Sequence, residues 1–453
     1  MDRNELQALI DRVIGKKGIL RAPSYWMRRV FSNLMDYADG KAEEANAYTD
    51  NAVKNVKVEV DNEMSDESEN AVSNKVIKAY IDSGTQILNE GIKANAGSIV
   101  YIIDKLYGSP MYIEALEDMS LSIYGEAQYY YSRDMVTWDR VSNPTTITQG
   151  EKIYLKAENV AASNVVGSIN TSGRYNAGGH ITSMLYGEDY YKHTSLEGHN
   201  NAFMSFFTGT KIVDASQLVL PSDTTSYCYA YMFKDCAELI YAPACIPAEI
   251  ISSYACESMY ENCTSLEETS ELPATRIYAG GCYGMYKGCT SLKRVSAMTI
   301  TSVGMSSMAY MFEDCTSLES APMTLNSINN SCYQGMFRNC TSLKEAPELP
   351  VKTTKSDAYD CYSSMFAGCT SLETAPTLPI ETLQRRMYQS MFYGCSSLNK
   401  ITMLATNTSG TNCLTSWVSG VATTGTFIKA KGVTLPTGVN GIPEGWTVEE
   451  VEV

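Results

Sequence analysis

An eight-residue segment, Met311 to Leu318, recurs at nearly constant spacing through much of this 453-residue chain. The copies are aligned on a cysteine, and successive cysteines lie 25 to 29 residues apart, at Cys236, Cys263, Cys289, Cys315, Cys340, Cys369 and Cys395. Weaker copies at Phe206 and Trp417 extend the series to about nine units. A period of this length is typical of a solenoid, a propeller or another repeat array.

The pattern within one repeat predicts a helical turn followed by a short strand. Cys332, Met336, Phe337 and Cys340 are spaced by three and four residues, as on one face of a helix. Pro347 then prevents the helix from continuing. We therefore predict an α/β solenoid over residues 164–426. Its core is expected to contain one methionine and one cysteine per repeat, at Met232, Cys236, Met259, Cys263, Met285, Cys289, Met311, Cys315, Met336, Cys340, Met365, Cys369, Met391 and Cys395.

The fourteen cysteines all lie between Cys228 and Cys413, within the repeats. Equivalent side chains in stacked coils are about 5 Å apart, which suits a column of small apolar groups. Buried free thiols are therefore favoured over disulfides or a metal site, and no cysteine or histidine spacing is typical of zinc ligands. Function is then expected in variable outward residues such as Glu313 and Glu319.

The segments on either side of the repeats have different patterns. Residues 96–163 contain short alternating segments that predict a small all-β, sandwich-like domain. Its tyrosines Tyr129, Tyr130 and Tyr131 and Trp138 could form a sugar-stacking patch, but packing across a sheet is the favoured interpretation. Residues 427–453 are predicted to form a C-terminal cap in which Phe427, Ile428 and Trp446 cover the last coil.

Residues 1–95 have the pattern of helices separated by turns. A narrow apolar seam, formed by Leu34, Ala38, Ala45, Ala52 and Val56, buries little surface in one chain but could line the axis of a homotrimer. We therefore predict a coiled-coil-like oligomerising stalk, and a solvated surface helix is the alternative.

Charge and motif content exclude several classes of function. The formal charge of −16 gives no basic excess to attract nucleic acid or anionic lipid, and no run of 18 apolar residues or signal peptide is present. We therefore expect a chain made in the host cytoplasm that does not insert into membranes. The chain has only three histidines and contains no phosphate-binding or nucleophile motif. We therefore expect no enzymatic activity, cofactor, catalytic residue or metal site.

Two parts of the chain resemble known families. Phe366 to Leu372 resembles the repeat of the BspA-like, or treponemal, leucine-rich repeats, which implies a bacterial surface adhesin that binds a host glycan or protein. Residues 68–82 and 47–53 resemble the N-terminal segments of tail and fibre proteins of bacteriophages, which implies attachment to other virion proteins. Together these resemblances predict a virion appendage, such as a tail fibre, that presents the solenoid for host recognition after release by lysis. A bacterial adhesin is the alternative, and a polysaccharide-degrading enzyme is a more distant one.

Overall fold

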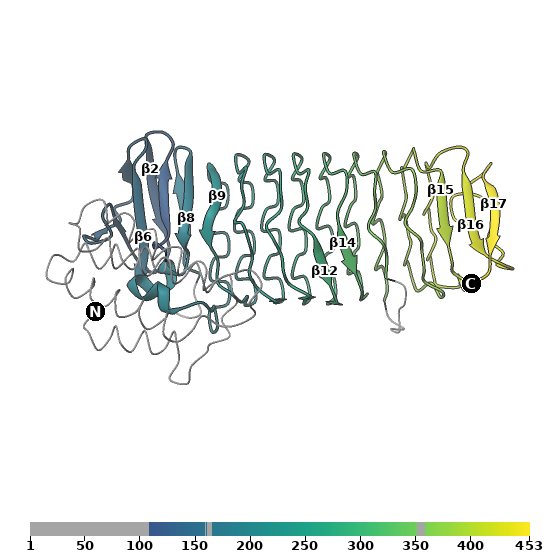
Figure 1. Ribbon diagram of the computed structural model, residues 1–453, viewed down its shortest axis with the longest axis horizontal. Coiled ribbons are helices and arrows are strands. Elements are labelled where there is room, and N and C mark those ends of the chain that lie inside the picture. Colours follow the sequence, from purple (N-terminus) through teal and green to yellow (C-terminus); the bar gives the residue numbers. More distant parts are fainter. Residues whose placement is uncertain (1–107, 159, 161–164, 351–357) are drawn as a thin grey trace, which may run out of the picture. The chain divides into compact units, whose positions relative to one another are not determined.

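The computed structural model describes residues 108–158, 160, 165–350 and 358–453. Residues 110–133 and 138–453 belong to one compact unit, in which coils follow one another from the N-terminal sheets to the C-terminal strands (Figure 1). The stalk predicted over residues 1–95, with its seam from Leu34 to Val56, lies outside the described residues.

Two sheets precede the coils. The larger sheet has the order β4-β3-β6-β1-β8-β9, and the smaller has the order β5-β2-β7. Alternate residues of both sheets are buried in one continuous hydrophobic core. The strands are β1 (Tyr112–Ala115), β2 (Met119–Tyr124), β3 (Gln128–Ser132), β4 (Asp139–Arg140), β5 (Thr145–Ile147), β6 (Lys152–Glu158), β7 (Ser168–Thr171), β8 (Tyr175–His180) and β9 (Ile212–Val219).

The larger sheet leads directly into the coils. It crosses the predicted domain boundary between residues 163 and 164, because β8 and β9 lie beyond it. Strand β9 pairs in parallel with β8, and Asp214 of β9 forms a bridge to Tyr241 of the next coil. The first coil is thereby covered by β-structure of its own chain, which closes an end that would otherwise be open.

Each coil contains a series of turns with one repeated backbone conformation. Every fourth residue of the series has a positive φ, between 48° and 80°, from Asn201, Ser205 and Gly209 in the first coil to Asn412, Ser416 and Gly420 in the ninth. The residue directly before the repeat cysteine always occupies the third of these positions, and it is Asp, Asn or Gly in each repeat. These residue types adopt the left-handed conformation at the least cost.

The turns satisfy the backbone by two alternating sets of hydrogen bonds. In the third coil the amide N–H groups of Cys256, Ser258 and Tyr260 donate to carbonyl oxygens of the next coil, each at 2.8 Å. The intervening N–H groups donate to the carbonyl three residues back, as from Glu257 to Tyr254 at 3.2 Å. Successive N–H groups of the turns thus have partners, and the bonds between coils form a ladder along the array.

The predicted α/β solenoid, with a helical turn in each coil, is wrong. A positive φ at every fourth residue interrupts a right-handed helix, and alternate N–H groups bond to the next coil instead of to residue i−4. The described residues are almost entirely strand and turn. Their helices are the four-residue α6 (Ser183–Tyr186) and the six-residue 3-10 helix η1 (Gly187–Lys192), and neither has the length and hydropathy needed to cross a bilayer.

Short parallel strands continue the coils, and the last three strands close the array. They are β10 (Ile250–Ile251), β11 (Arg276–Ile277), β12 (Met298–Ile300), β13 (Ser302–Val303), β14 (Met323–Leu325), β15 (Lys400–Met403), β16 (Thr426–Ala430) and β17 (Thr447–Val451). In this final segment Phe427 and Trp446 are buried and Ile428 is partly buried. The indole N–H of Trp446 donates to the Ala422 carbonyl at 2.8 Å.

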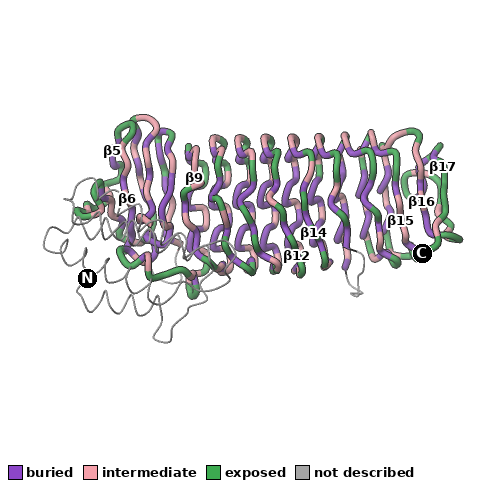
Figure 2. Tube along the Cα trace, in the orientation of Figure 1, coloured by how far each residue is buried: buried purple, intermediate pink, exposed green. Residues whose placement is uncertain are grey.

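Buried side chains repeat from coil to coil, so buried and exposed segments alternate along the array (Figure 2). One column consists of aromatic rings whose neighbouring centroids are 5.0 to 5.8 Å apart and whose planes differ by 2° to 9°. We call this the aromatic column; it comprises Phe207, Phe233, Tyr260, Tyr286, Phe312, Phe337, Phe366 and Phe392. The rings stack because each coil places the equivalent residue above the previous one.

Gly335→Ala tests the turn geometry. Gly335 has a φ of +59°, and an added Cβ would lie 2.5 Å from ring carbons of Tyr310. The strain of an alanine in the left-handed backbone conformation and the clash of its Cβ with the Tyr310 ring together should lower the free energy of unfolding by about 2–3 kcal/mol. In a Tyr310→Ala background the same substitution should cost only the strain, about 1–2 kcal/mol. Urea unfolding of the four proteins measures both values, and equal costs in the two backgrounds would contradict the proposed contact.

Candidate functional site

The predicted repeat-core residues lie in the interior of the coils. All seven methionines and seven cysteines have a relative exposure of 0%. Each of these cysteine thiols donates a hydrogen bond to the carbonyl of the aromatic-column residue in the preceding coil, as from Cys315 Sγ to Tyr286 O at 3.1 Å. Burial raises the pKa of these thiols, to about 12 for Cys395. A protonated, enclosed thiol is a poor nucleophile, so these residues support the fold.

The three histidines lie near the start of the coils. The ring of Tyr186 stacks on His193, with centroids 3.9 Å apart, and meets His199 edge-on at 5.5 Å. Burial, followed by the charge of His193, lowers the pKa of His199. No group of three potential metal ligands occurs among the residues that the structure describes. The histidines therefore pack with aromatic side chains at this end of the coils.

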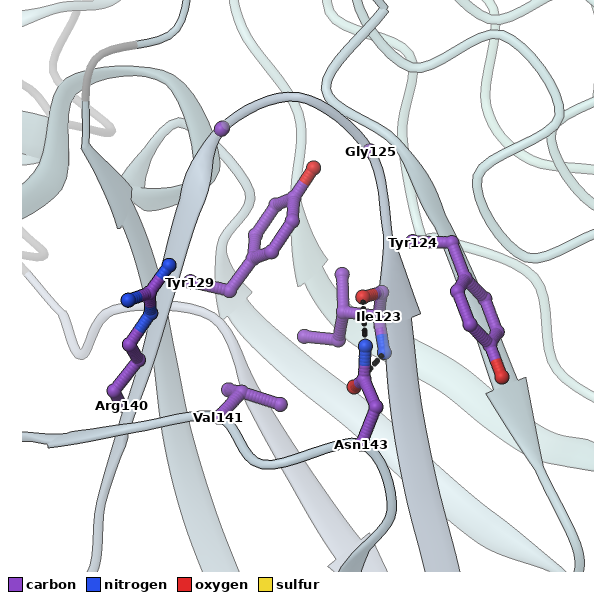
Figure 3. A pocket seen from close by; sticks show the side chains of 8 residues that line it. Ile123, Tyr124, Gly125, Tyr129, Arg140, Val141 and Asn143 are labelled. Carbon is purple, nitrogen blue, oxygen red and sulfur yellow. Dashed lines mark hydrogen bonds between the residues drawn. The ribbon is translucent and has the colours of Figure 1, made fainter.

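A small pocket of about 220 Å³ lies where β2 turns into β3 (Figure 3). Asn143 is held there by two hydrogen bonds with the backbone of Ile123, at 2.9 and 3.0 Å. The Tyr129 hydroxyl donates to the Val166 carbonyl at 2.5 Å, and Tyr129 is only 7% exposed. Since the polar groups of Asn143 and Tyr129 already have partners within the chain, the pocket offers few groups for a ligand.

The other aromatic residues proposed for sugar stacking are also engaged within the chain. Lys156 Nζ lies 4.7 Å from the ring centroid of Trp138 and 5.4 Å from that of Tyr130. The same ammonium forms an ion pair with Glu188 at 2.8 Å. These contacts agree with the packing interpretation.

A set of tyrosines lies on the outward side of the turns in coils two to five. Tyr227, Tyr231, Tyr254, Tyr283 and Tyr310, here called the tyrosine face, are all partly exposed. Four of them occupy positive-φ positions, where other coils have Ser, Gly, Asn, Asp or Arg. Their rings are not part of the aromatic column, so the fold alone does not require them.

The tyrosine face is held rigid by contacts among its own side chains. The rings of Tyr227 and Tyr254 stack at 4.9 Å, and those of Tyr283 and Tyr310 meet edge-on at 5.6 Å. The Tyr254 ring also covers the backbone of Gly280, where an added Cβ would approach within 2.3 Å. Fixed aromatic side chains lose little conformational entropy when a partner binds.

Charged side chains beside the tyrosine face form an alternating column. Lys234 pairs with Glu261 at 2.9 Å, and Glu313 pairs with Lys287 at 2.7 Å and with Arg338 at 3.5 Å. The Glu313 side chain is only 7% exposed, and Glu319 pairs with Lys344 at 3.0 Å. The two glutamates expected to carry function therefore have cationic partners within the chain.

The tyrosine face was not predicted from the sequence. Its tyrosines alternate with core residues and look like further members of the hydrophobic pattern. The sequence pattern that could have identified them is their spacing of four residues. Tyr227 and Tyr231 are spaced like Ser331 and Gly335, the positive-φ residues of a later coil. The tyrosines at these positions are partly exposed although they are large and aromatic.

Comparison with known proteins supports the repeat family. Residues 257–359 and 309–417 match the model described as BspA type leucine-rich repeat region, in six copies, so the chain contains BspA-type leucine-rich repeats, as the sequence predicted. One similar solved structure is a leucine-rich repeat protein from Bacteroides ovatus, with 17% identity over 55% of this chain and 69% of that one and a TM-score of 0.24. No curated protein matches the chain. Neither of these two findings shows a bacteriophage fibre.

Proposed function

We propose that this protein is a binding protein of the adhesin type, which uses the tyrosine face to contact a macromolecule outside the cell that makes it. The proposal rests mainly on the partly exposed tyrosines, which are concentrated on one side of adjacent coils and lie outside the aromatic column. Tyrosine is enriched where proteins bind partners, because its ring buries a large area and its hydroxyl forms hydrogen bonds. The presence of BspA-type repeats is consistent with this function.

The double substitution Tyr283→Ser/Tyr310→Ser tests the proposed surface. Binding to an array of immobilised surface proteins and glycans should fall by about tenfold or more, since aromatic anchors commonly contribute over 1–2 kcal/mol each. Tyr393→Ser is the matched control, because Tyr393 is 54% exposed but lies in the eighth coil. Unchanged binding by the double variant, or an equal loss in the control, would remove the tyrosine face from the proposal.

A virion appendage is the second candidate, and it is supported by the resemblance of residues 47–53 and 68–82 to bacteriophage tail and fibre proteins. Both segments lie outside the described residues, as does the seam on which the predicted trimer depends. Immunogold labelling distinguishes a cell-surface adhesin from a virion component. Antibody against the coils should label intact cells if the protein is a cell-surface adhesin, and purified particles if it is a virion component. A signal confined to the cytosol would contradict both.

We also propose that the protein binds without catalysis. Thirteen of the fourteen cysteines are buried and Cys245 is partly exposed, and His193 stacks on the ring of Tyr186. Incubation with the bound glycan or protein should therefore leave that partner at its original length.

A further inference from the structure

Glu257 lies within the tyrosine face and differs from the other glutamates near it. The backbone N–H of Tyr231 donates to the Glu257 carbonyl at 2.8 Å, and burial, followed by the nearby Glu257 side chain, raises the pKa of the Tyr231 hydroxyl. Tyr283 occupies the position equivalent to Glu257 in the following coil, and the Ser258 N–H next to Glu257 donates to the Tyr283 carbonyl at 2.8 Å. The hydrogen bonds between coils therefore place Glu257 next to Tyr231 of the preceding coil and Tyr283 of the following one.

This carboxylate has no cationic partner of its own. The neighbouring ion pairs join Lys234 to Glu261 and Lys287 to Glu313, and no lysine or arginine of the described part of the chain lies within 4.0 Å of Glu257. Cationic side chains pair with the glutamates of the adjoining column, whereas Glu257 is partly exposed and lacks such a pair.

The chain itself shows how this face holds a cation. Lys234 Nζ lies 5.6 Å from the Tyr231 ring centroid and 2.9 Å from a Glu261 carboxylate oxygen. An ammonium is thus held between a tyrosine ring and a carboxylate, where cation–π attraction and a charge-assisted hydrogen bond act together. Glu257, Tyr231 and Tyr283 offer the same pair of groups to a cation from another molecule.

We infer that the tyrosine face binds an arginine-containing segment of a partner protein, whose guanidinium pairs with Glu257 and stacks against Tyr283. Arginine fits better than lysine, since its planar group can bond a carboxylate through two N–H groups while its face lies on a ring. The formal charge of −16 on the whole chain also favours the approach of a basic partner. This inference rests on the proposed function and specifies the chemistry of the partner.

The test is a binding titration with a fluorescent peptide of alternating arginine and serine, using the full chain. Glu257→Gln should weaken binding by about tenfold or more, the loss expected for a charge-assisted hydrogen bond, and Tyr283→Ser by about threefold or more. A peptide with citrulline in place of arginine should bind at least about tenfold more weakly, because it keeps the shape and loses the charge. Replacing arginine by lysine should give an intermediate affinity.

Glu268→Gln is the matched control, since Glu268 pairs with Arg294 at 2.8 Å away from the tyrosines. It should bind the peptide as the unaltered protein does. An equal loss in Glu257→Gln and Glu268→Gln would show nonspecific attraction and overturn the inference. So would unchanged binding by Glu257→Gln.

The array experiment of the proposed function separates the two failures. If the arginine peptide does not bind, but a neutral glycan on the array binds in a way that depends on Tyr283 and Tyr310 and not on Glu257, the inference falls and the proposed function stands. If neither the binding of the arginine peptide nor the binding on the array depends on the tyrosines, the inference and the proposed function are both contradicted. Thermal unfolding of each variant confirms that the lost binding does not come from lost structure.

Discussion

Raising the pH above about 9 is expected to unfold this protein over a narrow range. Burial raises the pKa of Cys228, Cys282, Cys332 and Cys395 to about 12 and that of Cys236 to about 11. Burial also raises the pKa values of seven further thiols: Cys256, Cys263, Cys289, Cys315, Cys340, Cys361 and Cys369. In the unfolded chain a thiol ionises near about pH 8.5.

The sign of the effect follows from proton release. A folded-state pKa above the unfolded value contributes stability that is complete below about pH 8.5 and is lost as the pH rises toward the folded value, because only the unfolded chain releases its protons. Each thiol then contributes a slope of up to about 1.4 kcal/mol per pH unit. A few thiols are enough to remove much of the ~5–15 kcal/mol that stabilises a typical domain.

Urea unfolding between pH 7 and 10 measures this slope. The stability should be nearly constant below pH 8 and fall steeply above 9. The double variant Cys289→Ala/Cys315→Ala should be less stable at pH 7 but should lose about 1.4 kcal/mol per pH unit less for each thiol removed. Buried tyrosines such as Tyr260 and Tyr286 have pKa values raised well above 10 by burial, so they steepen the loss only at higher pH. Equal slopes in the variant and the unaltered protein would contradict the thiol mechanism.

The sequence predicted the repeats and misassigned their backbone for the same reason. Over two turns, the positions Cys332, Met336 and Cys340 suit a helix of 3.6 residues per turn nearly as well as a turn series of period four. The distinguishing pattern was at Gly335 and Asn339, which are residue types that favour positive φ and lie four residues apart. In other coils tyrosines occupy the position equivalent to Gly335, so the pattern of residues that favour positive φ is interrupted.

The candidate site could not be predicted because it depends on registry between coils. Tyr231, Glu257 and Tyr283 are 26 residues apart in succession, and only the inter-coil hydrogen bonds bring them side by side. The sequence instead drew attention to Glu313, whose charge is balanced by Lys287 of the preceding coil and Arg338 of the following one. Identifying an unpaired charge requires knowledge of its neighbours in space.

Removing one ring from the middle of the aromatic column should strongly destabilise the coils. Phe312 is fully buried between Tyr286 and Phe337, with centroids 5.6 and 5.5 Å away and planes within 9°. Phe312→Ala removes both stacking contacts and leaves a cavity, so the free energy of unfolding should fall by about 3–5 kcal/mol. Phe312→Leu keeps much of the volume and should cost less.

The position of this cavity determines how the array unfolds. Each coil is stabilised mainly by its immediate neighbours, so weakening the fifth coil weakens the link between the coils before and after it. Hydrogen exchange should then show protection lost first around residues 306–340 in Phe312→Ala, and thermal unfolding should separate into two steps. Tyr393→Ala removes a ring that is 54% exposed and should leave one transition at an almost unchanged temperature. A single, unshifted transition in Phe312→Ala would show that the stacked rings do not couple neighbouring coils.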